Sequence, residues 1–164
     1  MIFLTVGTLF PFDRLVKAID NAVAEGIITQ QVFGQIGKTS FKPKHIEYVE
    51  TLNKKSFDEK VSNADYLISH AGIGTIVIAL EQGKPLLVMP RMKRFKEHVN
   101  DHQVTTAQRF EQLGHILAAY SVEELPEKLQ QLRIFVPKLR ENQAQAVADR
   151  IALFLQSLTN ESVR

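Results

Sequence analysis

The chain has 164 residues, no cysteine and a net charge of +2 from 20 basic and 18 acidic residues. Its length suits one domain with a single core, its mean hydropathy of −0.09 excludes wholesale disorder, and its small charge gives no support to a nucleic-acid partner. The lack of cysteine excludes a disulfide-stapled mini-protein, a thiol nucleophile and a cysteine-ligated metal site.

The chain opens on an apolar run, residues 2–6, which we expect to form the first strand. The run lacks the basic flank and the long apolar stretch of a signal peptide. No run in the sequence approaches the ~20 apolar residues of a membrane span. We therefore expect a cytoplasmic protein whose contact with any membrane is peripheral.

Strand-like and helix-like segments alternate along the rest of the chain. Short β-branched runs predict strands at residues 31–36, 46–49, 66–69, 85–89 and 115–119. Helical spacing predicts helices at residues 13–25, 56–63, 74–82, 100–113, 122–132 and 137–158, with a frayed tail at 159–164. The alternation predicts one α/β domain over residues 1–158, Rossmann-like and in three layers around a mostly parallel sheet.

Ligands of open α/β sheets bind at the carboxyl ends of the strands, so the turns after the strands are the candidate sites. After the first strand, Gly7 permits a ligand to approach the backbone closely, and Thr8 offers a hydroxyl. The alternative is a tight turn without a ligand. Asp13, a few residues later, is either a helix N-cap or a binding residue.

The turn after the strand at residues 66–69 carries two glycines, Gly72 and Gly74. Their spacing exposes backbone N–H groups at a helix N-terminus, an arrangement that suits phosphate, and Thr75 can bond a phosphate oxygen or cap the helix. Val77 stands where a dinucleotide fingerprint would have its third glycine, which disfavours a dinucleotide. His70 is either a ligand contact or a satisfied structural histidine.

Residues 90–103 are dense in hydrogen-bonding groups. His98 and His102 are spaced to share a helical face, but no third ligand stands at a characteristic spacing, so we predict no metal site. The basic residues of this segment are Arg91, Lys93, Arg94 and Lys96. They form a solvated loop, or one that contacts anionic lipid headgroups or substrate phosphates. With Phe95 as the single interleaved aromatic, nucleic acid is disfavoured.

Several stretches together resemble the C-terminal, donor-binding domain of glycosyltransferase family 28, which is one half of a GT-B fold. They are Val6-Gly7-Thr8, Pro11-Phe12-Asp13-Arg14-Leu15, Gln35-Ile36-Gly37, Ser69-His70-Ala71-Gly72-Ile73-Gly74-Thr75, Gly83-Lys84-Pro85, Pro90 and Asn100-Asp101-His102-Gln103. The resemblance covers residues 1 to about 114. Within the family, the chain is similar to the small subunits of two-component exopolysaccharide and capsule glycosyltransferases and to the catalytic subunit of the dolichol-pathway N-acetylglucosaminyltransferase.

The resemblance implies a UDP-sugar donor and no cofactor. The residues that it places at the donor are Gly7, Thr8, His70, Gly72, Ile73, Gly74, Thr75, Glu97, Asn100, His102 and Gln103. The diphosphate would lie on residues 72–75 and near Gly7 and Thr8, while His102 and Gln103 would hold the sugar hydroxyls. The uracil would lie against backbone near residues 49–50. The resemblance assigns no catalytic residue.

One position departs from the family pattern. Many members carry a glutamate on the helix after the glycine turn, where its carboxylate accepts the ribose hydroxyls, whereas Ile78 stands at the matching position here. An alkyl side chain does not replace those hydrogen bonds. Either the ribose is held differently, by Glu97 for instance, or donor binding is weak without the partner; Glu81 lies three residues further along. The resemblance favours the first, because the small exopolysaccharide subunits often have an uncharged residue at this position.

The resemblance covers one half of a GT-B enzyme and implies one subunit of a heterodimer. A membrane-anchored partner would bind a lipid-linked sugar acceptor at the cytoplasmic face of the membrane. The expected reaction is inverting and metal-independent, with backbone N–H groups and a helix dipole stabilising the departing UDP. Two alternatives stay open: a non-catalytic activating subunit that stabilises a partner transferase, and a small nucleotide- or phosphosugar-binding enzyme that acts alone, as a homodimer.

The last expected helix, residues 137–158, has an apolar stripe. The stripe consists of Val147, Ile151, Phe154, Leu155 and Leu158. It either covers the sheet of this domain or reaches across to the partner.

Overall fold

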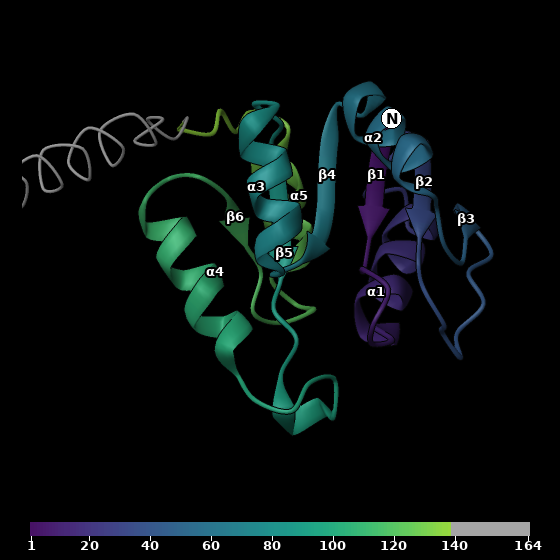
Figure 1. Cartoon of the computed structure of the whole chain (residues 1–164). Helices are drawn as coiled ribbons and strands as arrows, with labels where there is room; N and C mark the ends of the chain where they lie inside the picture. The colour runs from purple at the N-terminus through teal and green to yellow at the C-terminus, as the bar shows by residue number, and fades with distance from the viewer. Residues whose placement is uncertain (139–164) are drawn as a thin grey trace, which may run out of the picture.

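The computed structural model describes residues 1–138 as a parallel sheet with helices on both faces (Figure 1). The strands are β1 (Ile2–Thr5), β2 (Val32–Gln35), β3 (Glu47–Val49), β4 (Tyr66–His70), β5 (Leu86–Met89) and β6 (Leu117–Ala118). The helices are α1 (Asp13–Ala24), α2 (Lys54–Asn63), α3 (Ile73–Glu81), α4 (His102–Gln112) and α5 (Leu125–Leu132), with the 3-10 helix η1 (Lys93–Phe95) after β5. The expected helix at 137–158, its apolar stripe and the tail lie outside the described residues.

The strand order in the sheet is β3-β2-β1-β4-β5-β6, and every pair is parallel. The chain starts in the middle of the sheet, builds outward through β2 and β3, and then crosses back to place β4 on the other side of β1. This is the doubly wound order, so the Rossmann-like fold expected from the sequence is confirmed. Thr5 pairs with Ser69, and the ends of β1 and β4 are therefore level with each other.

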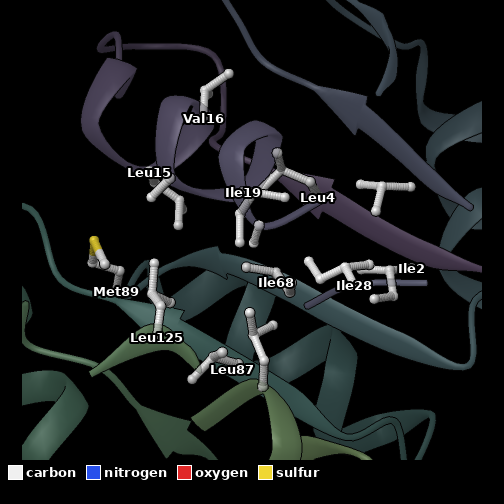
Figure 2. Close-up of a cluster of buried hydrophobic side chains, with 14 of the residues drawn as sticks. Ile2, Leu4, Leu15, Val16, Ile19, Ile28, Ile68, Leu87, Met89 and Leu125 are labelled. Atoms are coloured by element: carbon white, nitrogen blue, oxygen red, sulfur yellow. The ribbon is translucent and has the colours of Figure 1, made fainter. Parts of the chain in front are cut away.

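The core consists of two apolar layers, one on each face of the sheet. Alternate residues of one strand supply both layers, since Leu4 belongs to the first and Phe3 to the second. Helices α1 and α5 cover the first layer, where Leu15, Ile19 and Leu125 meet the strands (Figure 2). Helices α2, α3 and α4 cover the second layer. The sheet is thereby fixed from both sides, and its carboxyl edge carries the loops.

The starts of three helices differ from the expected ones by two residues or more, for local reasons. Helix α5 begins three residues late, at Leu125, after a turn in which the Leu125 backbone N–H donates to the Val122 carbonyl oxygen at 3.2 Å. Helix α2 begins two residues early because the Asn53 side chain caps it, accepting from the Ser56 backbone N–H at 2.9 Å. Helix α4 begins two residues late, at His102. Asn100 accepts from the backbone N–H of His102 at 3.3 Å and Asp101 accepts from that of Lys93 at 2.7 Å, so both residues belong to the loop. Within residues 1–138, no helix has the length and apolarity to cross a membrane.

Candidate functional site

The loops after β1, β4 and β5 meet at the centre of the carboxyl edge. Gly7, in the first loop, has a left-handed backbone with φ +73°, and a side-chain carbon added there would lie 3.1 Å from the His70 ring. Gly37, at the end of β2, is also left-handed, and its added carbon would lie 3.3 Å from the Gly7 carbonyl oxygen. Glycine is required at position 7 by both conformation and space. At the ends of β1, β2 and β4, the backbone of Gly7 therefore packs against the His70 ring on one side and close to Gly37 on the other.

His70 is held at the end of β4 in its neutral form. The Ser69 hydroxyl donates its one proton to the Thr5 carbonyl oxygen at 2.7 Å, so its 3.1 Å contact with His70 Nδ1 requires that nitrogen to carry the proton. Burial, helped by the positive charge of Arg91, lowers the pKa of His70 to about 4. The neutral ring then has an unprotonated Nε2, on the side that faces Gly72.

The turn from β4 into α3 is built from small residues. Gly72 is the N-cap, and a carbon added there would lie 2.3 Å from His70 Nε2, so a larger residue does not fit without movement. Gly72 has no side chain to cap this helix end, and apart from the neighbouring residues and backbone of α3, no described residue lies within 4 Å of a carbon added at Gly74. The first turn of α3, which contains Ile73, Gly74 and Thr75, is therefore neither capped by a side chain nor crowded at Gly74. Such a helix end suits an anion.

Arg91 braces the loop after β5 from inside. Arg91 is 3% exposed, and its guanidinium donates from Nη2 to the carbonyl oxygens of Val6 and Phe10, both at 2.6 Å. It also lies 5.0 Å from the centre of the Phe12 ring, and burial lowers its pKa to about 10. The placement of Arg91 in an exposed basic loop was therefore wrong. This cation ties the β5 loop to the β1 loop and does not face solvent.

Glu97 and Gln103 are engaged within the same loop. Both oxygens of Glu97 accept from Arg14, each at 2.8 Å, and one of them also accepts from the Met92 backbone N–H at 3.1 Å. Gln103 is buried, and its side-chain oxygen accepts from the Arg91 backbone N–H at 3.1 Å. In this arrangement, both residues shape the loop. Their roles at a ribose or a sugar stay predictions.

His98, Asn100 and His102 lie at the outer end of this loop. The two imidazoles are 4.6 Å apart in a T-shaped arrangement, and His102 Nδ1 contacts the Asn100 side-chain oxygen. Burial, His102 and Arg91 together lower the pKa of His98. Across residues 1–138, there is no group of three histidine or carboxylate side chains that could hold a metal ion.

Two carboxylates of α1 hold the long loop between β2 and β3, a role that sequence reasoning missed. Asp13 accepts from the Thr39 and Ser40 hydroxyls and from the Ser40 backbone N–H, so it is not the helix cap; Phe12 has that position. Asp20 is buried and accepts from the backbone N–H groups of Lys44 and His45 at 3.0 and 2.7 Å. The sequence does not show these hydrogen bonds, because the partners lie 24 to 27 positions apart and meet only in the folded chain.

The β2–β3 loop encloses a pocket of about 340 Å³ at the same edge. Its lining residues are Ile36, Gly37, Lys38, Thr39, Phe41, Lys42, Tyr48 and Glu50. A larger, shallower hollow of about 580 Å³ is lined by α2 residues alone, and no strand-end residue contributes to it. The smaller pocket is the one that lies next to the glycines of the edge, through Gly37 and its contact with Gly7.

The sequence of residues 1–158 matches the glycosyltransferase family 28 C-terminal domain. The chain belongs to this family. The mouse UDP-N-acetylglucosamine transferase subunit ALG13 is 34% identical over 123 residues, which are 70% of this chain but 10% of that protein. A Synechococcus elongatus UDP-N-acetylglucosamine–N-acetylmuramyl-(pentapeptide) pyrophosphoryl-undecaprenol N-acetylglucosamine transferase is 29% identical over 120 residues, covering 73% of this chain and 32% of that protein.

Solved structures show the same fold. The solution structure of ALG13 has a TM-score of 0.59 at 20% identity and covers 83% of this chain and 87% of that one. Acinetobacter baumannii MurG has a TM-score of 0.53 at 20% identity, covering 81% of this chain and 40% of that one. The family 28 domain described here is therefore a Rossmann-like half of a GT-B fold, as expected, and it spans a tenth of its mouse relative.

This family 28 domain brings part of the expected site together and separates the rest. Gly7 and Gly72 both lie against the His70 ring, and Gly74 follows Gly72 in the first turn of α3. Asn100 and His102 contact each other where the loop that Arg91 braces enters α4, and no hydrogen bond within residues 1–138 joins them to His70 or its glycines. Thr8, next to Gly7, is exposed.

Proposed function

We propose that this chain is the UDP-sugar-binding subunit of an inverting, two-subunit glycosyltransferase. The acceptor would be a lipid-linked sugar of exopolysaccharide or capsule synthesis, bound by a membrane-anchored partner. The uncapped N-terminus of α3 carries the proposal, because no side-chain cap satisfies it and the space at the Cβ position of Gly74 is free. Family membership and relatives named for UDP-N-acetylglucosamine support the nucleotide and the transfer.

The diphosphate would lie between the first turn of α3 and the loop at Gly7 and Thr8. Backbone N–H groups of residues 73–75 would donate to its oxygens, and the helix dipole would favour its charge. His70 lies against both Gly7 and Gly72, so its ring would meet the same phosphates. A bound dianion would favour the protonated ring and allow Nε2 to donate.

The nucleoside would occupy the pocket under the β2–β3 loop. Gly37, Tyr48 and Glu50 line this pocket, and Glu50 lies where the uracil is expected against the backbone. Asp13 and Asp20 fix the loop that forms its wall. The pocket and the α3 N-terminus then sit on either side of Gly7, which suits a molecule with a base at one end and a diphosphate at the other.

The chemical step requires stabilisation of the negative charge that develops on the departing UDP. We infer that fixed N–H groups, the dipole of α3 and His70 supply it without a metal ion. The acceptor hydroxyl and the general base would belong to the partner, which would complete the GT-B cleft. The chain would reach the inner face of the membrane through that partner.

Calorimetric titration of the purified chain with UDP in EDTA tests the proposal, with GDP and ADP as controls for the base. Gly74→Val should weaken UDP binding roughly 100-fold, since loss of two charge-assisted hydrogen bonds of ~1.5 kcal/mol each accounts for that factor. Gln130→Val, an exposed position on α5, is the matched control and should bind UDP normally. Unchanged affinity in a folded Gly74→Val protein would remove the phosphate assignment, and no binding by the chain or by its complex with the partner would indicate an activating subunit.

A further inference from the structure

Four large apolar side chains are exposed where the β1–α1 loop meets the β5–α4 loop. They are Leu9 (86% exposed), Val99 (69%), Phe95 (47%) and Phe10 (40%). The Phe10 and His98 rings are 5.2 Å apart, and Arg91 donates to the Phe10 carbonyl oxygen, so the two loops are in direct contact. We call residues 9–10 and 93–99 the loop tip. An apolar group of this kind on a surface indicates an interaction site.

The loop tip is also basic. Lys93, Arg94 and Lys96 are all exposed and flank Phe95. The acidic side chains of this loop are already engaged, because Glu97 is paired with Arg14 and Asp101 accepts from the Lys93 backbone N–H at 2.7 Å. The apolar side chains are thus surrounded by cations.

The loop tip has a defined shape. Arg14 joins Glu97 to α1, and Arg91 joins the same loop to β1. Lys96 adopts a left-handed backbone with φ 58°, which turns the chain after η1. Figure 1 shows this segment running beyond the strand ends to η1 before it returns to α4. A braced projection presents its side chains without the entropy cost of ordering a flexible loop.

We propose that the loop tip binds the surface of a membrane that contains anionic lipid. Apolar side chains flanked by Lys and Arg suit the boundary between headgroups and acyl chains, where the cations meet lipid phosphates. A protein interface is less consistent with this composition, because lysine is depleted at such interfaces and here lysines border the apolar centre. The proposal goes beyond attachment through a partner: this chain itself contacts lipid.

Lipid contact at this place would orient the domain. The loop tip and the α3 N-terminus both belong to the carboxyl edge of the sheet. A membrane against the loop tip would therefore bring this edge toward the lipid surface, where a lipid-linked acceptor has its reactive group. The orientation shortens the path between donor and acceptor.

Co-sedimentation of the full chain with vesicles tests the proposal. We expect binding to vesicles of equal parts phosphatidylcholine and phosphatidylglycerol, little binding to pure phosphatidylcholine, and a decrease with salt. The combined Lys93→Glu, Arg94→Glu and Lys96→Glu variant should bind at least roughly tenfold more weakly. The matched control, Lys54→Glu with Lys55→Glu on the exposed surface of α2, should change binding little. Equal loss in both variants, or equal binding to both vesicles, would overturn the proposal.

A single tryptophan reports insertion directly, because the chain has none of its own. Leu9→Trp should shift its fluorescence to the blue on addition of the anionic vesicles, while Leu113→Trp, at the other end of α4, should not. UDP titration of the same proteins shows whether the donor site is intact, so failure of lipid binding and failure of the proposed function are separable. If the loop-tip variants still bind the vesicles but no longer bind the partner subunit, the loop tip is a protein interface and the proposal is overturned.

Discussion

The turn after β4 and the loop after β5 leave neighbouring strands at one edge, but different interactions hold them. The turn is short, and its shape depends on glycines: Gly72 leaves room for the His70 ring, and the space at the Cβ position of Gly74 is free. The loop is long and depends on side chains from elsewhere, since Arg14 reaches Glu97 and Arg91 reaches back to Val6. Substitutions in the turn should therefore act on ligand binding, and substitutions in the loop should act on its position and on stability.

The largest effect on stability is expected from Arg91, the buried brace of the loop. Arg91→Met should lower the free energy of unfolding by ~4 kcal/mol, because two charge-assisted hydrogen bonds of 1.5–3 kcal/mol each are lost and their carbonyl groups stay buried. Urea denaturation measures the change. Arg91→Lys, which keeps one charge and one donor group, should recover part of it. A loss below ~1 kcal/mol would show that the loop is held by other contacts.

The turn contributes a pH dependence through His70, and His98 in the loop, whose pKa is also lowered, adds to it in the same direction. His70 has a pKa of about 4 in the folded chain against 6.5 ordinarily, so between these values the unfolded chain binds a proton that the folded chain does not. Stability should therefore fall by up to ~3 kcal/mol as the pH is lowered from 7 to 4. His70→Gln should flatten this slope in denaturation series. Asp13 and Asp20, whose pKa values are lowered from 3.8, add to the loss only from about pH 5 downward, and most of their stabilisation is lost below roughly pH 4.

Gly72→Ala should disturb the turn and leave the loop alone. The added carbon would lie 2.3 Å from His70 Nε2, and relief of such overpacking costs ~2 kcal/mol. UDP binding, measured by calorimetry, should weaken with it because the first N–H groups of α3 move. In a His70→Ala background there is no ring to clash with, so Gly72→Ala should cost little further stability there. If Gly72→Ala destabilises that background as much as it destabilises the original chain, the clash is not the cause.

The contrast between the two segments also explains what could be predicted from the sequence. His70, Gly72 and Gly74 are four positions apart at most, and their spacing at the start of a helix indicates an anion site without any knowledge of the fold. The loop is held by contacts between residues that are far apart in the sequence: Arg14 and Glu97 are separated by 83 positions, and Val6 and Arg91 by 85. In addition, nothing in the sequence distinguishes buried Arg91 from exposed Lys93. The sheet could be predicted from the alternation of strands and helices, because each element shows the hydrophobic pattern typical of its type within its own residues.

The predicted starts of helices were wrong for a related reason. A single side-chain hydrogen bond decides where a helix starts, as Asn53 does for α2, and helical spacing cannot show it. The role of Asp13 was missed in the same way, because its partners Thr39 and Ser40 reach it only after β2 has taken its place beside β1.

The smallest effect compares two ion pairs within the chain. Arg14–Glu97 is bidentate and largely buried, whereas Lys54–Asp58 lies on the exposed face of α2 at 2.7 Å. Double-mutant cycles with alanine should give a coupling of ~1 kcal/mol or more for the first pair and below ~0.5 kcal/mol for the second, since solvent screens the exposed pair.

Glu97→Gln then separates two roles of that carboxylate. If Glu97 only positions the loop, the variant should lose stability and bind UDP with little change, because the α3 N-terminus and the pocket do not contain it. If Glu97 leaves Arg14 to hold the ribose, UDP affinity should fall by about tenfold, the equivalent of one hydrogen bond to a charged group. Calorimetry with UDP and with pyrophosphate distinguishes the two roles. Loss of a ribose contact would weaken the binding of UDP but not of pyrophosphate, which has no ribose.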